Sequence, residues 1–413
     1  RSTLSPSSAA SDVYKRQLQG YWGGVDPGSF KEYHLLEGAN RRFIPDPREM
    51  RAFKFYYEWY SKLRGEGVGF VKVDNQCDQP RYFAGRVPVM EAARRLQHCL
   101  QAAAHGTGIE ILNCMCMTPE NYLNWITSNV ARASSDYVPF WKSGAKLHLI
   151  FCTYNSLWYS LFTWPDFDMF MSYDPYAWQH AVLRALSGGP VYLTDGPLGE
   201  PNADLISRLC FTDGRLPRPD TPAMPGRDVV FEDVYNGLKP LKAWSLARVE
   251  GFGDVAMIAV INVNAEGIEE EYEVKPSDVF DEEGQYVVYD WRTGKFGIYS
   301  LEERVTGKLG ELDWKLFIVS PVKGGVGLIG LSRIFTSPKG VRRLRKAGDR
   351  VFMEVEDEGV YKLYSESPPT RVVGEGGTYS EEKGLTRCRT YEYEEGLLSI
   401  RVPGGERLLL LEF

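Results

Sequence analysis

The sequence predicts an α/β protein in which a partial (β/α)₈ barrel, about strands 3 to 8, is followed by an all-β sandwich domain. Between residues 69 and 197, four short apolar runs end in a carboxylate and are separated by segments of helical character. This alternation is typical of parallel strands joined by crossover helices. After about residue 240 the chain consists of short β-rich runs separated by Gly, Pro and charged turns, which is typical of a sandwich.

Hydrophobic periodicity places the elements of the barrel. In the segment 47–65, Phe53, Tyr56 and Tyr60 recur at helical spacing, and in 89–105 Leu96 and Leu100 belong to an apolar face. The predicted order is strand 18–24, helix 47–65, strand 69–75, helix 89–105, strand 108–116, a short helix 119–127, strand 129–136, helix 143–162, strand 166–171, helix 175–187, strand 190–195 and helix 202–210.

These predicted strands number six, whereas a complete barrel has eight and takes about 250 residues. We therefore expect the two missing strands upstream of residue 1. The predicted domains are a non-native or disordered leader at 1–17, an N-terminally truncated catalytic barrel at 18–239 and a C-terminal β-sandwich at 240–413.

Composition and charge narrow the class of partner. The 413 residues include 48 basic and 55 acidic side chains, with a net charge of −7, which argues against nucleic acid or a membrane as a partner and favours a neutral substrate. The seven cysteines are scattered, so neither a zinc site nor a disulfide framework is indicated, and no other metal or cofactor is expected. The default location is cytoplasmic, and a homo-oligomer is left open.

Two carboxylates at predicted strand ends are candidate catalytic residues. Asp74 and Asp136 lie two strands apart in the predicted barrel. Retaining glycosidases use two carboxylates about 5 to 5.5 Å apart, and alternate strands of a barrel can supply that separation. From the residues alone, a coincidental pair of aspartates remains the main alternative.

More specific motifs occur in order along the chain. They are LQGYWGGV at 18–25, VKVD at 71–74, VARASSDY at 130–137, YNSL at 154–157, PDFDMF at 165–170, WKLF at 314–317 and GLIGL at 327–331. Together they resemble glycoside hydrolase family 36, in the branch of raffinose synthases, seed-imbibition proteins and alkaline and archaeal α-galactosidases.

The resemblance implies a retaining mechanism without a cofactor. Asp74 corresponds to the nucleophile and Asp136 to the residue that acts first as acid and then as base. Lys72 and Arg132 are expected to contact the sugar. Lys72 shares a strand face with Asp74, and the same alternation is expected for Arg132 and Asp136.

Other residues are expected to contact the substrate, and for several of them a purely structural role is the alternative. Asp168 resembles a substrate-site carboxylate, Asp166 fits equally well as a strand-start residue, and Trp22 and Trp164 are either sugar platforms or barrel packing. Cys114 occupies a strand end where this branch often has a cysteine. The segment NCMCMT at 113–118 replaces the Cys-x-Ser-Gly-Gly-Gly pattern of bacterial members, which puts their contacts to the 2-hydroxyl in doubt.

The leading functional expectation is hydrolysis of terminal α-galactosides, with a galactose-containing oligosaccharide of the raffinose type, linked α-1,6, as substrate. One alternative is galactosyl transfer of the raffinose synthase type, which would use the same two aspartates. Another is a non-catalytic carbohydrate-binding fragment, which the presence of both aspartates disfavours. Without the first strands, the chain is expected to be an incomplete enzyme.

Overall fold

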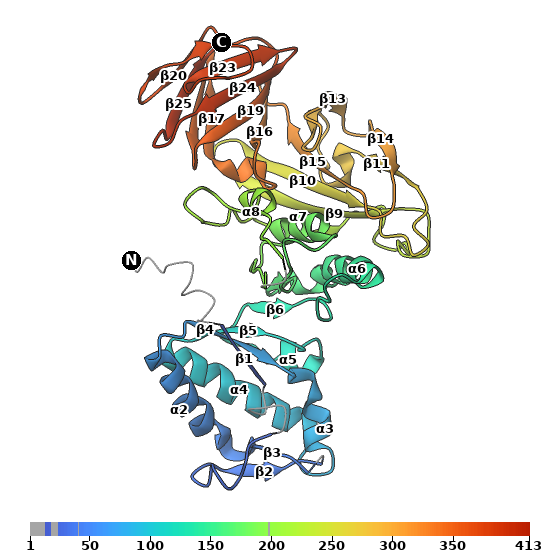
Figure 1. Ribbon diagram of the computed structural model, residues 1–413, viewed down its shortest axis with the longest axis vertical. Coiled ribbons are helices and arrows are strands. Elements are labelled where there is room, and N and C mark those ends of the chain that lie inside the picture. Colours follow the sequence, from blue (N-terminus) through green and yellow to red (C-terminus); the bar gives the residue numbers. More distant parts are fainter. Residues whose placement is uncertain (1–12, 18–23, 40, 197–198) are drawn as a thin grey trace. The chain divides into compact units, whose positions relative to one another are not determined.

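The computed structural model describes residues 13–17, 24–39, 41–196 and 199–413 (Figure 1). Its backbone contacts divide the chain into two compact units. The first comprises Arg1–Ser135 and Leu161–Asp166, and the second comprises Asp136–Ser160 and Phe167–Phe413. The division falls within the predicted barrel, directly before Asp136.

The first unit contains a five-stranded sheet in the order β1-β4-β5-β6-β7, in which every pairing is parallel. Its strands are β1 (Val13–Gln17), β4 (Phe70–Asp74), β5 (Glu110–Asn113), β6 (Val130–Arg132) and β7 (Trp164–Asp166). A small hairpin, β2 (Leu35–Glu37) with β3 (Phe43–Pro45), precedes the helices. The helices are η1 (Arg48–Met50), α2 (Ala52–Gly65), η2 (Gln76–Asp78), α3 (Gln79–Phe83), α4 (Val89–Thr107) and α5 (Pro119–Tyr122).

Alternation along β4 separates the core of this unit from its polar strand face. Val71 and Val73 are fully buried in a cluster with Tyr56 and Leu100, which come from helices α2 and α4. These two helices lie side by side in Figure 1. Because successive side chains of a strand point to opposite faces, Lys72 and Asp74 must lie on the face away from this apolar cluster.

Several strands differ from the sequence prediction. The predicted strand 18–24 lies outside the described residues except for its last one, whereas Val13–Gln17, part of the predicted leader, forms β1. Strand β6 ends at Arg132 because its ladder with β7 ends there, so Asp136 lies in the following loop. In place of a strand at 190–195 there is an isolated parallel bridge between Phe170 and Leu193.

The second unit contains the remaining helices and all the later strands. The helices are α6 (Lys142–Tyr159), α7 (Ala177–Ser187), α8 (Ala203–Ser207), η3 (Pro276–Asp278) and η4 (Ser337–Gly340). A six-stranded sheet has the order β13-β12-β15-β10-β9-β8, and β11 pairs with β14. The bounds are β8 (Met224–Pro225), β9 (Leu241–Val249), β10 (Gly253–Ile261), β11 (Glu270–Val274), β12 (Gln285–Asp290), β13 (Phe296–Ser300), β14 (Val305–Leu309) and β15 (Trp314–Pro321).

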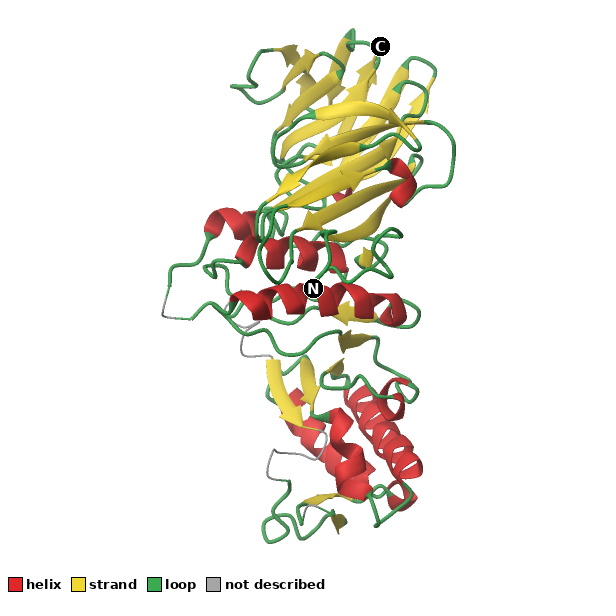
Figure 2. Ribbon diagram, turned by 90° about the vertical axis from the view of Figure 1, so that its right-hand side faces the viewer, coloured by secondary structure: helices red, strands yellow, loops and turns green. Residues whose placement is uncertain are grey.

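The last fifth of the chain, from Val326 onward, forms two five-stranded sheets, which are seen as yellow strands near the C-terminus in Figure 2. One has the order β16-β19-β24-β23-β22 and the other β17-β18-β25-β20-β21. Their bounds are β16 (Val326–Leu331), β17 (Val341–Ala347), β18 (Arg350–Val355), β19 (Gly359–Ser365), β20 (Arg371–Gly374), β21 (Gly377–Thr378), β22 (Ser380–Glu381), β23 (Thr390–Glu394), β24 (Leu397–Val402) and β25 (Leu408–Glu412). A partial barrel followed by β-sandwich structure is therefore confirmed.

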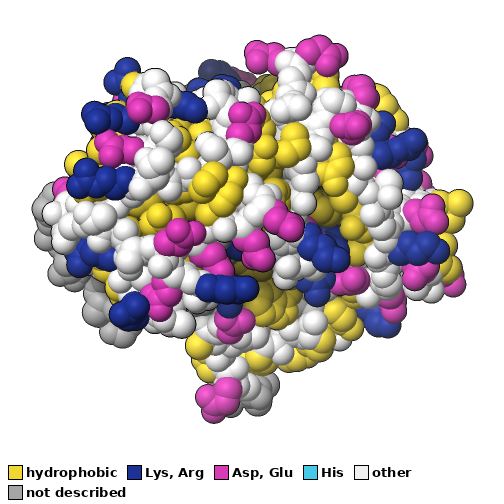
Figure 3. Space-filling model, turned by 90° about the horizontal axis from the view of Figure 1, so that it is seen from above, with side chains coloured by type: hydrophobic (Ala, Val, Ile, Leu, Met, Phe, Trp, Pro, Cys, Tyr) yellow, Lys and Arg dark blue, Asp and Glu magenta, His cyan; other side chains and the backbone are white. Residues whose placement is uncertain are grey.

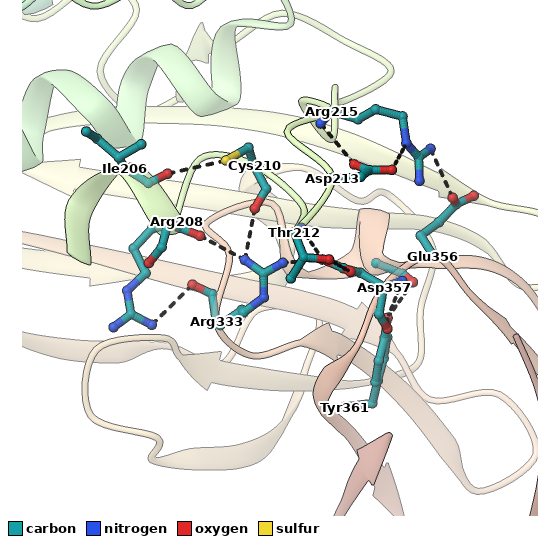
Figure 4. A network of polar contacts seen from close by, with 12 residues as sticks. Ile206, Arg208, Cys210, Thr212, Asp213, Arg215, Arg333, Glu356, Asp357 and Tyr361 are labelled. Carbon is teal, nitrogen blue, oxygen red and sulfur yellow. Dashed lines mark hydrogen bonds and ion pairs between the residues drawn. The ribbon is translucent and has the colours of Figure 1, made fainter. Parts of the chain in front are cut away.

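Arg333 joins the segment after α8 to these last sheets (Figure 4). Its guanidinium donates to the carbonyls of Ser207 and Cys210, at 2.8 and 2.9 Å, and pairs with Asp357. Asp357 also accepts from the backbone N–H of Thr212 at 2.7 Å. Burial alone would raise the pKa of Asp357, but the hydrogen bonds from Thr212 and the charge of Arg333 outweigh it and hold that pKa below its usual range.

On the face drawn in Figure 3, Lys and Arg side chains are interspersed with Asp and Glu side chains. In the part of the chain that the structure describes, no helix is both long and apolar enough to cross a membrane.

Glu270 is a buried carboxylate whose ionisation should make the stability of the fold depend on pH. It shares the inward face of β11 with Tyr272 and Val274, and only 2% of it is exposed. Burial raises its pKa from 4.5 to about 7, against the opposing influence of Asn264 and the charge of Lys146. The folded state therefore favours protonated Glu270.

We predict that Glu270 makes stability fall as pH rises from about 4.5 through 7, because the unfolded chain ionises this group first. A shift from 4.5 to about 7 corresponds to about 3 kcal/mol. Glu270→Gln, which mimics the protonated form, should be more stable than wild type at pH 8 by up to that amount and nearly equal to it below pH 4.5. Urea unfolding at several pH values measures the difference. The exposed neighbour Glu271 is the control, since Glu271→Gln should leave the pH profile unchanged.

Candidate active site at the strand ends

The carboxyl ends of four parallel strands bring polar side chains to one edge of the first unit's sheet. Asp74 ends β4, Arg132 ends β6 and Asp166 ends β7. Cys114 directly follows β5, and its N–H donates to the carbonyl of Val73 at 2.8 Å. Arg132 and Asp166 are register partners. Four of the predicted site residues are thus brought together by strand pairing alone.

Arg132 connects this cluster. Its Nη2 donates to the sulfur of Cys114 at 3.0 Å, and its Nη1 donates to the carbonyl of Ser135 at 3.3 Å. Its Nε lies 3.9 Å from Oδ2 of Asp166. Arg132 is 1% exposed and Asp166 is 0% exposed, so a full cation and a full anion are held together in a buried site. Such a pair is costly to separate.

Asp74 and Lys72 share the polar face of β4. They are 1% and 4% exposed. Oδ1 of Asp74 accepts a hydrogen bond from the backbone N–H of Asn75 at 2.8 Å. Asn75 has a left-handed backbone with a φ of 59°, which turns the chain at the strand end and directs that N–H toward the carboxylate. This hydrogen bond fixes the orientation of the Asp74 carboxylate.

Asp136 and Asp168 belong to the second unit. Asp136 is exposed and lies four residues beyond the end of β6, so the expected strand alternation between Arg132 and Asp136 is wrong: the ladder ends before the residue is reached. Asp168 is fully buried, and its carboxylate accepts from the N–H of Tyr137 at 2.9 Å and from the hydroxyl of Tyr192 at 3.2 Å. These contacts of Asp168 therefore fix the residue that follows Asp136.

A second carboxylate anchors the same loop. Oδ2 of Asp174 accepts from the hydroxyl of Tyr137 at 2.7 Å and from the N–H of Phe140 at 2.8 Å. Burial and the hydrogen bond to Asp174 raise the pKa of Tyr137, so its phenol stays a donor. The loop that begins with Asp136 is thus held at Tyr137 and Phe140 while Asp136 itself is exposed.

Arg184 supports the backbone of Asp168, which is left-handed with a φ of 61°. The guanidinium donates to the carbonyls of Asp168 and Met169, at 2.8 and 3.0 Å. Arg184 is almost fully buried. Strained backbone of this kind persists only where the surroundings hold it.

The two predicted sugar platforms have different outcomes. Trp164, at the start of β7, is half-buried and stands opposite Val130 in the ladder, and its role as a substrate contact stays a prediction. Trp22 lies outside the described residues.

Within the described ranges, no group of three or more His, Cys, Asp or Glu side chains is placed to hold a metal ion.

Sequence reasoning missed a group of buried carboxamides beneath the strand ends. Gln97 and Gln101 lie next to Leu96 and Leu100 on helix α4, and both are fully buried. Polar residues spaced four apart beside an apolar stripe were the available signal, because a buried amide must find hydrogen-bond partners.

Comparison with known proteins decides the family. Residues 45–258, just over half of the chain, match the family model described as "Raffinose synthase or seed imbibition protein Sip1". The chain belongs to this family. The predicted resemblance to the raffinose synthase branch is therefore confirmed.

The raffinose synthase family is also represented among curated relatives. The chain is 29% identical over 460 aligned positions to a galactinol–sucrose galactosyltransferase of Oryza sativa, covering 94% of this chain and 55% of that protein. It is 28% identical over 425 positions to stachyose synthase of Pisum sativum, covering 87% of this chain and 49% of that protein. The chain thus spans about half the length of the curated relatives it matches.

A solved structure supports the fold. A family 27 β-L-arabinopyranosidase variant from Geobacillus stearothermophilus, solved in complex with arabinose, aligns with a TM-score of 0.50 at 15% identity. The alignment covers 68% of this chain and 65% of that one. At this identity the similarity concerns the fold alone.

The relatives correct the functional expectation. The sequence motifs led us to expect hydrolysis first, but the curated relatives are named as galactosyltransferases and a stachyose synthase. The hydrolase expectation is therefore wrong, and the transferase alternative is favoured. The physical reason for the error is that both reactions use the same pair of carboxylates and differ only in the group that accepts the sugar.

We predict that Arg132→Met lowers the free energy of unfolding by about 3 to 5 kcal/mol, because it removes the buried guanidinium that lies 3.9 Å from the Asp166 carboxylate. Adding Asp166→Asn should recover part of the loss, and the resulting double-mutant cycle should give a coupling energy of about 0.5 to 3 kcal/mol. Denaturant unfolding of the single and double variants measures it.

The surface ion pair on α4 provides the control. Arg95 and Glu91 lie 2.6 Å apart with largely solvated side chains, so Arg95→Met should cost less than about 1 kcal/mol. Additive losses for Arg132 and Asp166 would show that the two residues are not coupled.

Proposed function

We propose that the protein transfers an α-galactosyl group from a galactoside donor to a hydroxyl of a carbohydrate acceptor, with retention of configuration. The observation that carries the proposal is the buried Asp74 at the end of β4, its carboxylate oriented by the N–H of Asn75, in a chain of the raffinose synthase family. The names of the relatives favour galactinol as donor and sucrose as acceptor.

In the first half-reaction, a carboxylate oxygen of Asp74 attacks C1 of the galactosyl group. The bond from C1 to the leaving oxygen breaks while Asp136 donates its proton to that oxygen. The products are a covalent galactosyl ester on Asp74 and the released alcohol. This step inverts the configuration at C1.

In the second half-reaction, Asp136 accepts the proton of an acceptor hydroxyl, whose oxygen attacks C1. The ester bond breaks and the Asp74 carboxylate is restored, so the two inversions give net retention. The proposal requires the two carboxylates to approach to about 5 to 5.5 Å in the working enzyme. The exposed position of Asp136 suits a group that must meet two different oxygens.

The cations have supporting roles in this proposal. Lys72 and Arg132 lie on β4 and β6 at the same edge as Asp74. Their N–H groups can donate charge-assisted hydrogen bonds to sugar hydroxyls. Water and sucrose compete for the same ester, so the choice between them depends on how well the acceptor is held rather than on the two aspartates.

The full-length protein should form a trisaccharide from galactinol and sucrose, and Asp74→Ala should abolish this, because no covalent ester can form. With an aryl α-galactoside that has a good leaving group, added azide should restore turnover of Asp74→Ala and give a β-galactosyl azide, since the anion attacks from the vacated side. Chromatography of the products measures both results.

Two results would contradict this part of the proposal. Full activity in Asp74→Ala would show that another group attacks C1. Release of free galactose by the wild type at the same rate with and without sucrose would show that water, not a sugar hydroxyl, is the acceptor.

We predict that Asp136→Ala slows donors with poor leaving groups by several orders of magnitude and spares activated aryl galactosides in the first step, because only poor leaving groups need a proton. Burst kinetics separate that step from ester breakdown. Equal losses of the first-step rate on both classes of donor would remove Asp136 from the acid role.

A further inference from the structure

Six carboxamide side chains of the first unit are each 0% exposed. They are Gln76, Gln79, Gln97, Gln101, Asn113 and Asn121. They come from the segment after β4, from helix α4, from the end of β5 and from α5. Amides in such a position are expensive to bury unless they bond to one another, and here they form a continuous hydrogen-bonded chain.

Gln76 is the link between this chain and Asp74. It lies two residues after Asp74, and its Nε2 donates to the carbonyl of Val73 at 2.9 Å and to Oδ1 of Asn113 at 3.1 Å. The bond to Val73 spans Asp74 and Asn75, and the bond to Asn113 ties the same side chain to the end of β5. The Gln76 amide therefore closes the turn whose Asn75 N–H is bonded to the Asp74 carboxylate.

Gln97 donates a hydrogen bond to the oxygen of the Gln76 side-chain amide. From helix α4, its Nε2 donates to Oε1 of Gln76 at 2.8 Å and to Oδ1 of Asn121 at 3.0 Å. Both protons of the Gln97 amide group are thus used. Oδ1 of Asn121 also accepts from Gln79 at 2.7 Å, which ties the next residues of the same segment to α5.

The turn needs such support because of its backbone. Asn75 is buried and left-handed, with a φ of 59°, and its side chain donates to the hydroxyl of Tyr82 at 3.0 Å. A non-glycine residue in this region is held by its surroundings. Loss of the bond from Gln97 would leave Oε1 of Gln76 buried without that donor and free the amide to turn.

We propose that Gln97 is a positioning residue for the nucleophile Asp74, acting through Gln76. It fixes the turn after β4 so that one oxygen of Asp74 stays on the N–H of Asn75 and the carboxylate keeps its attack geometry. This inference rests on the proposed function, in which Asp74 attacks C1.

The test is Gln97→Leu in the full-length protein, which keeps the size of the side chain and removes both donors. We expect kcat to fall about 10- to 100-fold with KM changed less than about threefold, because misplacement of a reacting group by about 1 Å costs on this order. Steady-state rates with galactinol and sucrose, taken well below the melting temperature, measure the split.

Gln101 is the matched control. It is equally buried on the same helix, one turn further, but it bonds to Ser128 and Thr127 before β6 and not directly to the segment that carries Asp74. Its connection to Gln76 runs through Ser128 and Asn113, whereas Gln97 donates to Gln76 itself. Gln101→Leu should lower the melting temperature about as much as Gln97→Leu and leave kcat within about threefold. Equal losses of kcat in the two variants would overturn the proposal.

A second background separates positioning from general damage. In Asp74→Ala rescued by azide, the residue to be positioned is absent, so adding Gln97→Leu should leave the azide-dependent rate unchanged. A 10-fold or greater loss there would overturn the positioning role. Failure of azide to rescue Asp74→Ala with Gln97 intact would instead count against the proposed function.

Gln97→Met covers the case in which Gln97→Leu does not fold. The thioether side chain has nearly the same length as that of Gln97 but no N–H, so it cannot donate to Gln76 or Asn121 and should lower kcat in the same way. Wild-type kcat in a folded Gln97→Met variant would overturn the proposal.

Discussion

The candidate active site depends on keeping charged and amide side chains paired while a parallel sheet buries them. Lys72, Asp74, Arg132 and Asp166 are all 4% exposed or less, and the effective penalty for burying an ion is several kcal/mol. Strand alternation sends the apolar side chains of β4 toward the helices and leaves the charged ones on the opposite face. The pairing of β6 with β7 then places the cation of Arg132 beside the anion of Asp166. That register therefore brings opposite charges together in a buried site.

The turns after the strands are strained, and each strained residue is held by identified bonds. Asn75 after β4, Met115 after β5 and Asp168 after β7 all have left-handed backbone, with φ of 59°, 43° and 61°. The carbonyl of Met115 accepts from the N–H of Cys77 at 2.7 Å, which links two of these turns. Non-glycine residues of this kind cost on the order of 1 kcal/mol or more and gather where function requires a fixed geometry. Their position at successive strand ends agrees with an active site at this edge.

The choice between hydrolysis and transfer has a different physical origin from the rest of the chemistry. In the mechanism that we propose, formation of the sugar ester requires a nucleophile and an acid, the roles proposed for Asp74 and Asp136, and recognisable motifs surround both residues. The fate of the ester depends on whether an acceptor hydroxyl is held near C1 better than water, which is a property of loop surfaces that have no simple sequence pattern. This is why the motifs suggested the right family and the wrong reaction, and why the names of the relatives were needed to correct it.

The sequence by itself determined those features that depend on local periodicity. Helices α4, α6 and α7 appear close to their predicted bounds and Asp74 ends a strand as expected, whereas Asp166, placed at the start of a predicted strand, ends β7. Only the tertiary structure decided that β6 ends before Asp136, that Gln76, Gln97 and Asn121 form one chain, and that Glu270 faces a core. The reason is the separation along the sequence of the residues that interact. Alternation and helical spacing are set by neighbours two to four residues apart. Gln76 and Gln97 are separated by 21 residues, and their bond exists only because α4 packs back onto the sheet.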